Sequence, residues 1–375
     1  MASTERFIEL AAPGVQQLQP YLPGKPVEEL ERELGITGSI KLASNENPLG
    51  PSPAGLAAAQ KVLGNVNYYP DGGGHLLRMA LAEKHGVTPD CITLGNGSND
   101  VLELIARAFL TADRAAMFSQ YAFAVYPIVT QAIGATAQVV PALPVDHDNM
   151  PYGHDLDSMA GAIDEATRVV FIANPNNPTG TWLAPDELDS FLARVPGDII
   201  VVLDEAYYEY MPEDLQPATH RLLECYDNLV VTRTFSKIYG LAGLRVGYGV
   251  SCPEIADLLN RVRQPFNVNL PAQAAAVAAL ADEAHLGRSI ECNRTGLKQL
   301  SEGLRRLGLG HIPSIGNFIT VDFNAPAMPI YQALLREGVI VRPVGNYGMP
   351  HHLRITVGTG EQNKRLLDAL ENVLQ

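Results

Sequence analysis

Cysteine is scarce in this chain of 375 residues, and its four copies are scattered without a Cys-x-x-Cys pair. The spacing excludes a disulfide framework and argues against a zinc site, so we expect no metal and a reducing, cytoplasmic location. Because free cysteine is usually buried, we expect four buried thiols without a function. These are Cys91, Cys225, Cys252 and Cys292.

Basic residues are also few, since 27 Lys and Arg stand against 41 Asp and Glu and the formal net charge is -14. A nucleic-acid-binding surface needs clustered positive charge, so we expect no nucleic-acid partner. A small anionic ligand stays compatible with this composition, because a few placed arginines can bind it locally.

Long apolar runs are missing as well. No stretch approaches the roughly 18 uncharged apolar residues that suggest a membrane helix, so we expect no membrane partner. The start of the chain carries Glu5 and Glu9 and no long apolar core, which argues against a secretory signal. With 46% hydrophobic and 18% charged residues, the chain should fold as a large globular domain plus a smaller one.

Short β-branched runs alternate with longer amphipathic segments through the first two thirds of the chain. Strands separated by helical crossovers predict a mostly parallel sheet flanked by helices, hence an α/β fold. The run 199–203 is apolar at both parities, as in a strand buried on both faces; its length disfavours a buried helix. Expected strands are 91–94, 115–118, 137–140, 168–172, 199–203, 229–232 and 247–250, and expected helices are 99–110, 122–133, 185–194 and 253–259.

The pattern changes after Pro271. We expect a large domain over residues 46–270 and a smaller α/β domain over 271–375, while residues 1–45 form an N-terminal arm and part of the small domain. In the small domain, the expected helices are 272–281, 286–307, 329–337 and one from 361 onward, and the expected strands are 317–323, 339–342 and 353–357.

Two polar segments follow predicted strands, at the end of a sheet where ligands bind in open α/β folds. Residues 95–99, Gly-Asn-Gly-Ser-Asn, could offer a helix N-terminus to a phosphate, although taken alone they fit a plain turn and helix cap better. Residues 174–180, Asn-Pro-Asn-Asn-Pro-Thr-Gly, contain more amides than a structural turn needs, which favours a loop that faces a ligand.

Two further segments carry charge. Asp204, Glu205 and Tyr207 close the most apolar strand, where a carboxylate is costly unless a cation or donor meets it; a helix cap is the alternative. Lys237 lies among apolar and small residues, which suits a depressed amine pKa and a Schiff base with a carbonyl compound. A lone lysine is more often a solvated charge, so this interpretation depends on the neighbouring segments.

Together these segments resemble the histidinol-phosphate aminotransferases, fold-type I, aspartate-aminotransferase-like enzymes that use pyridoxal 5'-phosphate. The resemblance runs from about residue 20 to the C-terminus. It implies a cytoplasmic homodimer with shared active sites and a large domain plus a smaller α/β domain. It is carried by residues 41–53, 67–78, 95–100, 174–180, 204–207, 233–248, 265–269 and 353–359.

The resemblance also implies roles for single residues. Lys237 would hold the cofactor as a Schiff base and move protons, Asp204 would keep the pyridine nitrogen protonated, and Tyr207 would bond the phenolic oxygen. Arg354 would grip the acidic group of the substrate. The other expected cofactor contacts are Gly97, Ser98, Asn99, Tyr121, Asn177, Ser236, Arg245 and, from the neighbouring subunit, Tyr68; the other expected substrate contacts are Arg342, Tyr21 and Asn47.

The implied reaction transfers an amino group between glutamate and 2-oxoglutarate on one side and histidinol phosphate and imidazole-acetol phosphate on the other, in histidine biosynthesis. Two departures from the family pattern, at residues 95–100 and 119–121, lie where substrate choice could shift. An aromatic amino-acid aminotransferase is therefore the close alternative, and a decarboxylase of amino-acid phosphates a more distant one. A non-catalytic, pyridoxal-phosphate-binding regulator is disfavoured because Lys237, Asp204 and Arg245 are all present.

Overall fold

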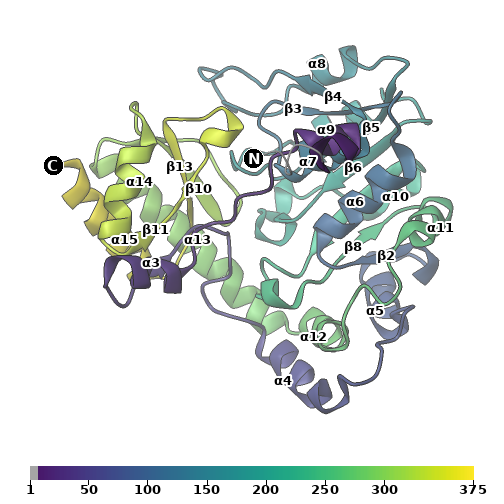
Figure 1. Ribbon diagram of the computed structural model, residues 1–375, viewed down its shortest axis with the longest axis horizontal. Helices are drawn as coiled ribbons and strands as arrows, with labels where there is room; N and C mark the ends of the chain where they lie inside the picture. The colour runs from purple at the N-terminus through teal and green to yellow at the C-terminus, as the bar shows by residue number, and fades with distance from the viewer. Residues whose placement is uncertain (1–6) are drawn as a thin grey trace.

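A seven-stranded sheet forms the centre of the larger of two lobes in the computed structural model, which describes residues 7–375 (Figure 1). All neighbouring strands are parallel except for β8, which runs antiparallel to both of its neighbours. The predicted mostly parallel sheet is thus confirmed. The strand order is β2 (Ile92–Gly95), β8 (Gly247–Val250), β7 (Leu229–Thr234), β6 (Ile200–Asp204), β5 (Thr167–Ala173), β3 (Ala115–Ser119) and β4 (Thr136–Val140).

Helices cover both faces of this sheet, and the alternation of side chains along β6 shows how. Ile200 and Val202 pack in a cluster with α6, α7 and α11, whereas Val201 and Leu203 point to the other face, toward α9. Since successive side chains of a strand alternate between faces, the pattern directs Asp204 to the first face. The helices are α6 (Ser98–Phe109), α7 (Val125–Ile133) and α11 (Pro253–Val262), and across the sheet α8 (Leu156–Gly161), α9 (Pro185–Leu192) and α10 (Thr219–Cys225).

The smaller lobe contains a four-stranded antiparallel sheet and a separate two-stranded parallel one. The predicted strand 339–342 is wrong as a single strand, because its two halves pair in different sheets. The four-stranded order is β12 (Arg342–Pro343), β13 (His352–Thr356), β10 (Phe318–Asp322) and β9 (Gly310–His311), and the pair is β1 (Ile40–Lys41) with β11 (Val339–Ile340). Its helices are α3 (Val27–Leu34), α13 (Glu283–Arg306), α14 (Ala327–Arg336) and α15 (Gly360–Leu374).

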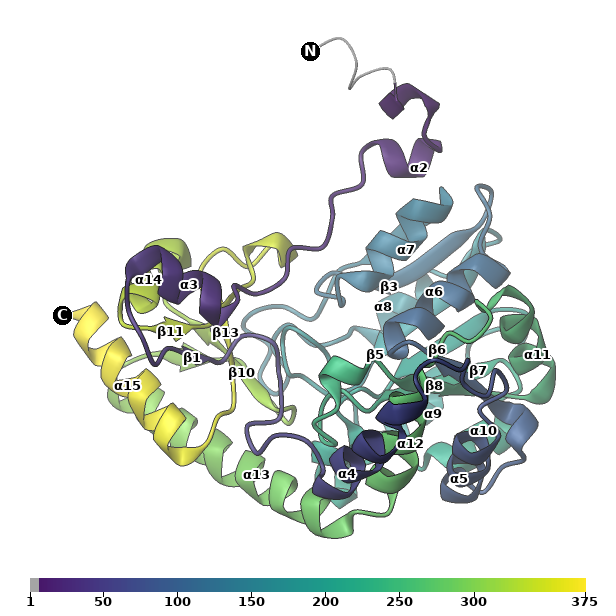
Figure 2. The ribbon, with the colours of Figure 1, turned by 60° about the horizontal axis from the view of Figure 1, so that its bottom comes forward.

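The N-terminal part of the chain contacts both lobes. Helix α2 (Pro13–Gln16) lies on α7, so closely that a Cβ atom at Gly14 would meet the carbonyl oxygen of Gln131 at 1.9 Å (Figure 2). An extended segment then leads to α3 and β1. Three further helices lie in the larger lobe, namely α4 (Pro53–Val62), α5 (His75–His85) and α12 (Leu270–Leu280). Residues 1–6, which include part of the segment examined for a secretory signal, lie outside the described range.

The expectation of four buried thiols is wrong. All four cysteines are unpaired, but Cys225 is exposed and the other three are partly exposed. Three of them lie at ends of helices and Cys292 lies within α13. Among the helices of residues 7–375, none combines the length and the apolar character that crossing a membrane requires.

Candidate active site

A cavity of about 410 Å³ opens where β5, β6 and β7 end, a size typical of small-molecule sites. Residues from both lobes form its wall, so segments far apart in the sequence meet there. Of the residues expected from the sequence, the wall contains Tyr21, Ser98, Asn99, Asn177, Asp204, Tyr207, Ser236, Lys237, Arg245 and Arg354.

Lys237 is partly buried in this wall. Its Nζ donates a hydrogen bond to the carbonyl oxygen of Ser44 at 3.1 Å and lies 5.6 Å from the centre of the Tyr207 ring. Burial, reinforced by the positive charge of Arg354, lowers the pKa of Lys237 to about 8. With this pKa, about a tenth of the amine is neutral and nucleophilic at pH 7.

Asp204 ends β6 and is nearly inaccessible to solvent. Its Oδ2 accepts a hydrogen bond from the hydroxyl of Tyr126 at 2.8 Å, and its Oδ1 accepts one from Thr232 at 3.1 Å. Burial raises the pKa of this carboxyl above its ordinary value, while both hydrogen bonds oppose the rise. A cation placed in the cavity would further stabilise the ionised form.

Tyr207 follows Asp204 by three residues in the sequence and lines the same cavity wall. The side-chain amide of Asn45 donates to its hydroxyl oxygen at 2.9 Å, a partner that the sequence did not suggest. Burial raises the pKa of Tyr207 to about 12, so its hydroxyl stays protonated and can donate to an anionic oxygen.

A group of anion-binding donors surrounds the start of α6. Gly97 caps this helix at φ +88, and Ser98, Ser236 and Arg245 line the cavity beside it. A Cβ atom at Gly97 would lie 2.5 Å from Nη2 of Arg245, so glycine permits the guanidinium to approach the helix end. Free N–H groups, two hydroxyls and an arginine are the donors that a phosphate group requires.

Arg354 of β13 offers a second place for an anion. Its Nη2 donates to the carbonyl oxygen of Ala43 at 2.6 Å and its Nη1 donates to Oδ1 of Asn177. Burial lowers the pKa of Arg354, and within residues 7–375 no carboxylate forms a salt bridge with it. A buried guanidinium without a counter-ion favours an acidic ligand in the cavity.

Apart from Gly97, which caps α6 beside the wall, four expected site residues do not line the cavity. The ring of Tyr121 packs edge-on against Tyr152 with 5.3 Å between centroids, and Phe123, two residues further along the turn, lines the cavity instead. The Asn47 amide donates to the carbonyl oxygen of Ile238 at 2.7 Å, which fixes the turn that follows Lys237.

The other two lie apart from the wall for different reasons. Arg342 donates to the carbonyl oxygen of Leu22 at 2.6 Å and its guanidinium lies 5.3 Å from the centre of the Tyr21 ring, so it holds the arm segment that reaches the cavity. Tyr68 is 69% exposed on the surface. Its expected contact with a neighbouring subunit stays a prediction.

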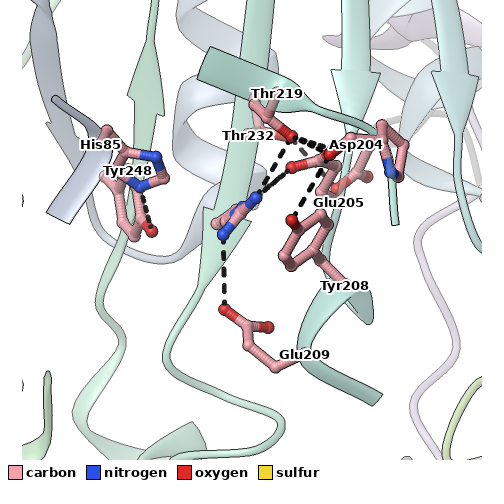
Figure 3. A network of polar contacts seen from close by, with 10 residues as sticks. His85, Asp204, Glu205, Tyr208, Glu209, Thr219, Thr232 and Tyr248 are labelled. Carbon is pink, nitrogen blue, oxygen red and sulfur yellow. Dashed lines mark hydrogen bonds and ion pairs between the residues drawn. The ribbon is translucent and has the colours of Figure 1, made fainter. Parts of the chain in front are cut away.

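A buried polar network lies on the opposite face of the same strand ends (Figure 3). Glu205 is fully buried and accepts hydrogen bonds from Nε of Arg233 at 2.8 Å and from the Thr219 hydroxyl at 2.8 Å. The Arg233 guanidinium stacks 3.6 Å from the centre of the Tyr208 ring. Since Glu205 follows Asp204 directly, this network anchors the β6 end that presents Asp204 to the cavity.

Comparison with known proteins places the chain in a family. The family described as aminotransferase class I and II matches residues 37–370. The chain belongs to this family. Histidinol-phosphate aminotransferase 2 of Pseudomonas fluorescens is 60% identical over 98% of both chains, and histidinol-phosphate aminotransferase 1 of Nitrosococcus oceani is 54% identical over 98% of both.

A solved structure extends the likeness from sequence to fold. The histidinol-phosphate aminotransferase of Sinorhizobium meliloti, determined in complex with pyridoxal-5'-phosphate, superposes with a TM-score of 0.88 at 30% identity over 97% of both chains. The resemblance inferred from the motifs is thus confirmed, as are the predicted aminotransferase class and the fold-type I architecture.

Proposed function

We propose that this aminotransferase uses pyridoxal 5'-phosphate to convert imidazole-acetol phosphate and glutamate into histidinol phosphate and 2-oxoglutarate, and the reverse. The observation that carries the proposal is one cavity that combines a partly buried Lys237 of lowered pKa, the carboxylate of Asp204 and two separate anion-binding groups. The relatives named above support the substrate, because their names specify histidinol phosphate.

The residues present fit the proposed cofactor. The phosphate of the cofactor would be held by Gly97, Ser98, Ser236 and Arg245. The short distance between the Arg245 guanidinium and Gly97 at the helix end supports this assignment. Further contacts of the cofactor are proposed for Asn99, Asn177, Asp204, Tyr207 and Lys237. When bound, the protonated pyridine ring supplies a sink for electrons released at the substrate carbon.

Each catalytic side chain then has a defined task. Lys237 would hold the cofactor covalently through Nζ. Once the substrate amine displaces it, the neutral lysine amine would move the proton between the substrate carbon and the cofactor. Asp204, oriented by Thr232, would pair with the ring nitrogen and keep it protonated, while the Tyr207 hydroxyl would donate to the phenolic oxygen. Phe123 lies in the wall together with Tyr21 and Tyr207 and would cover one side of the ring.

Arg354 is the proposed partner for the acidic group of the substrate, which is the phosphate of histidinol phosphate or the carboxylate of glutamate. Tyr21 reaches the same cavity from the N-terminal arm, and Arg342 keeps Tyr21 in place. An aromatic amino acid would use the same arginine through its carboxylate, so it stays the second candidate substrate.

We also propose that the protein works in the cytoplasm as a homodimer with shared active sites. Tyr68 supports the dimer. It and its neighbour Tyr69 are 69% and 81% exposed, although tyrosine side chains are usually at least partly buried. Leu63 and Val66 beside them are exposed as well, so the segment presents an apolar surface that a second subunit would cover.

A panel of amino donors tests the proposed substrate. Purified protein with pyridoxal phosphate is assayed with histidinol phosphate, phenylalanine and tyrosine, each with 2-oxoglutarate, and kcat/KM should be highest for histidinol phosphate. A preference for phenylalanine would favour the aromatic aminotransferase instead. Borohydride reduction should attach the cofactor at Lys237, and a protein that stays colourless and unlabelled at this position would refute the whole proposal.

A further inference from the structure

The Tyr126 hydroxyl reaches the carboxylate that the proposed function assigns to the cofactor ring. Tyr126 is the second residue of α7 and is 1% exposed, and its hydroxyl lies 2.8 Å from Oδ2 of Asp204. Thr232 of β7 donates to the other oxygen, so each carboxylate oxygen has one side-chain donor. Since a carboxylate oxygen accepts two hydrogen bonds, Asp204 keeps capacity for a ring nitrogen in the cavity.

Three aromatic side chains fix the Tyr126 ring. It stacks on Phe171 of β5 with 4.7 Å between centroids and 8° between planes, and Phe123 meets it edge-on at 5.9 Å. Phe118 of β3 packs on it at 6.4 Å. A ring held in this way cannot turn its hydroxyl away from Asp204. Burial also raises the pKa of Tyr126 well above its ordinary value, so the hydroxyl remains a donor.

We propose that Tyr126 is a positioning residue of the aminotransferase site, whose hydroxyl orients the Asp204 carboxylate toward the cofactor ring nitrogen and keeps it ionised. Tyr126 does not line the cavity, so it acts only through Asp204. Without the hydroxyl, Asp204 retains Thr232 as its side-chain donor, and the carboxylate is free to turn or to take up a proton. Both changes weaken its contact with the ring. The inference rests on the proposed function.

The substitution Tyr126→Phe isolates the hydroxyl, because phenylalanine keeps the three aromatic contacts. In this variant kcat with pyridoxal phosphate should fall by about tenfold or more, while KM for the amino donor changes by less than about twofold. In the protein stripped of cofactor, the dissociation constant for pyridoxal phosphate, measured by fluorescence titration, should rise by about tenfold.

A cofactor analogue separates an effect on the ring nitrogen from an effect on packing. The analogue of pyridoxal phosphate with carbon in place of the ring nitrogen offers Asp204 no partner, so Tyr126→Phe and the unmodified protein should bind it equally well. Thr232→Val, which removes the second donor, should show the same difference between the two cofactors.

Tyr239→Phe is the matched control. The Tyr239 hydroxyl is also buried but has no hydrogen-bond partner among the described residues, so its removal should leave kcat and both dissociation constants unchanged. Equal weakening of both cofactors by Tyr126→Phe, or no change with pyridoxal phosphate, would overturn the inference alone. An unmodified protein that binds no pyridoxal phosphate would overturn the proposed function and this inference with it.

Discussion

The buried pair of Glu205 and Arg233 gives a sharp prediction about stability. Arg233→Met removes the cation but retains much of the side-chain volume, and it leaves a carboxylate that is 0% exposed without its partner. Breaking a buried ion pair from one side costs about 3–5 kcal/mol, because the remaining charge stays desolvated. If the chain of 375 residues unfolds as one unit, this corresponds to a fall in Tm of about 4–6 °C.

Two further variants complete the thermodynamic cycle. Glu205→Gln should lower Tm less than Arg233→Met, because Arg233 keeps Glu209 at 3.9 Å and the Tyr208 ring at 3.6 Å. The double variant carries no unpaired charge at position 205, so it should melt above Arg233→Met. Tm is followed by circular dichroism on the protein without cofactor.

Arg261→Met is the control, since the Arg261–Asp257 pair is 69% and 60% exposed and its loss should hardly change Tm. The reasoning is refuted if the decrease in Tm of the double variant equals the sum of the decreases of the two single variants. Such additivity would mean that the two charges do not depend on each other.

Three predictions concern the cavity. Modification of Lys237 by an aldehyde in the cofactor-free protein should increase with pH around a midpoint near 8, because only the neutral amine reacts; peptide mapping against pH that gives the ordinary value of 10.5 would contradict the burial argument. Gly97→Ala places a methyl group 2.5 Å from Nη2 of Arg245, so the dissociation constant for pyridoxal phosphate should rise by about tenfold or more in a fluorescence titration. Arg354→Gln should raise KM for histidinol phosphate and for glutamate by about tenfold to a hundredfold in steady-state assays, and an unchanged KM for both would remove Arg354 from the substrate site.

The sequence predicted the large sheet well because all of its strands except the edge strand β4 are buried on both faces. The first four residues of β6 are apolar and only Asp204, at its end, is polar. Such continuous apolar runs are recognisable without knowledge of the neighbouring strands. The short strands were harder to predict. β1 and β11 contain two residues each, and their pairing depends on contacts between the two ends of the chain that no local pattern reveals.

In the site, too, local motifs could be predicted from the sequence, whereas contacts between distant residues could not. Lys237, Asp204 and Arg354 were predicted because each lies in a motif with a recognisable chemistry, and the structure brings all three to one cavity. Asn45 and Tyr126 were missed, since their roles arise from hydrogen bonds to residues 162 and 78 positions away. Phe123 was missed because the turn before α7 directs it, rather than Tyr121, into the cavity.

The pairing of β1 with β11 has a consequence for biosynthesis. Ile40 leaves the ribosome about 300 residues before its partner Val339, which at about 5–20 residues per second means a wait of roughly 15 to 60 seconds. By the end of this interval the seven strands of the larger sheet have all left the ribosome, whereas β1 still has no strand to pair with. The smaller lobe therefore closes last, and the arm that carries Tyr21 to the cavity takes its place only when synthesis is almost complete.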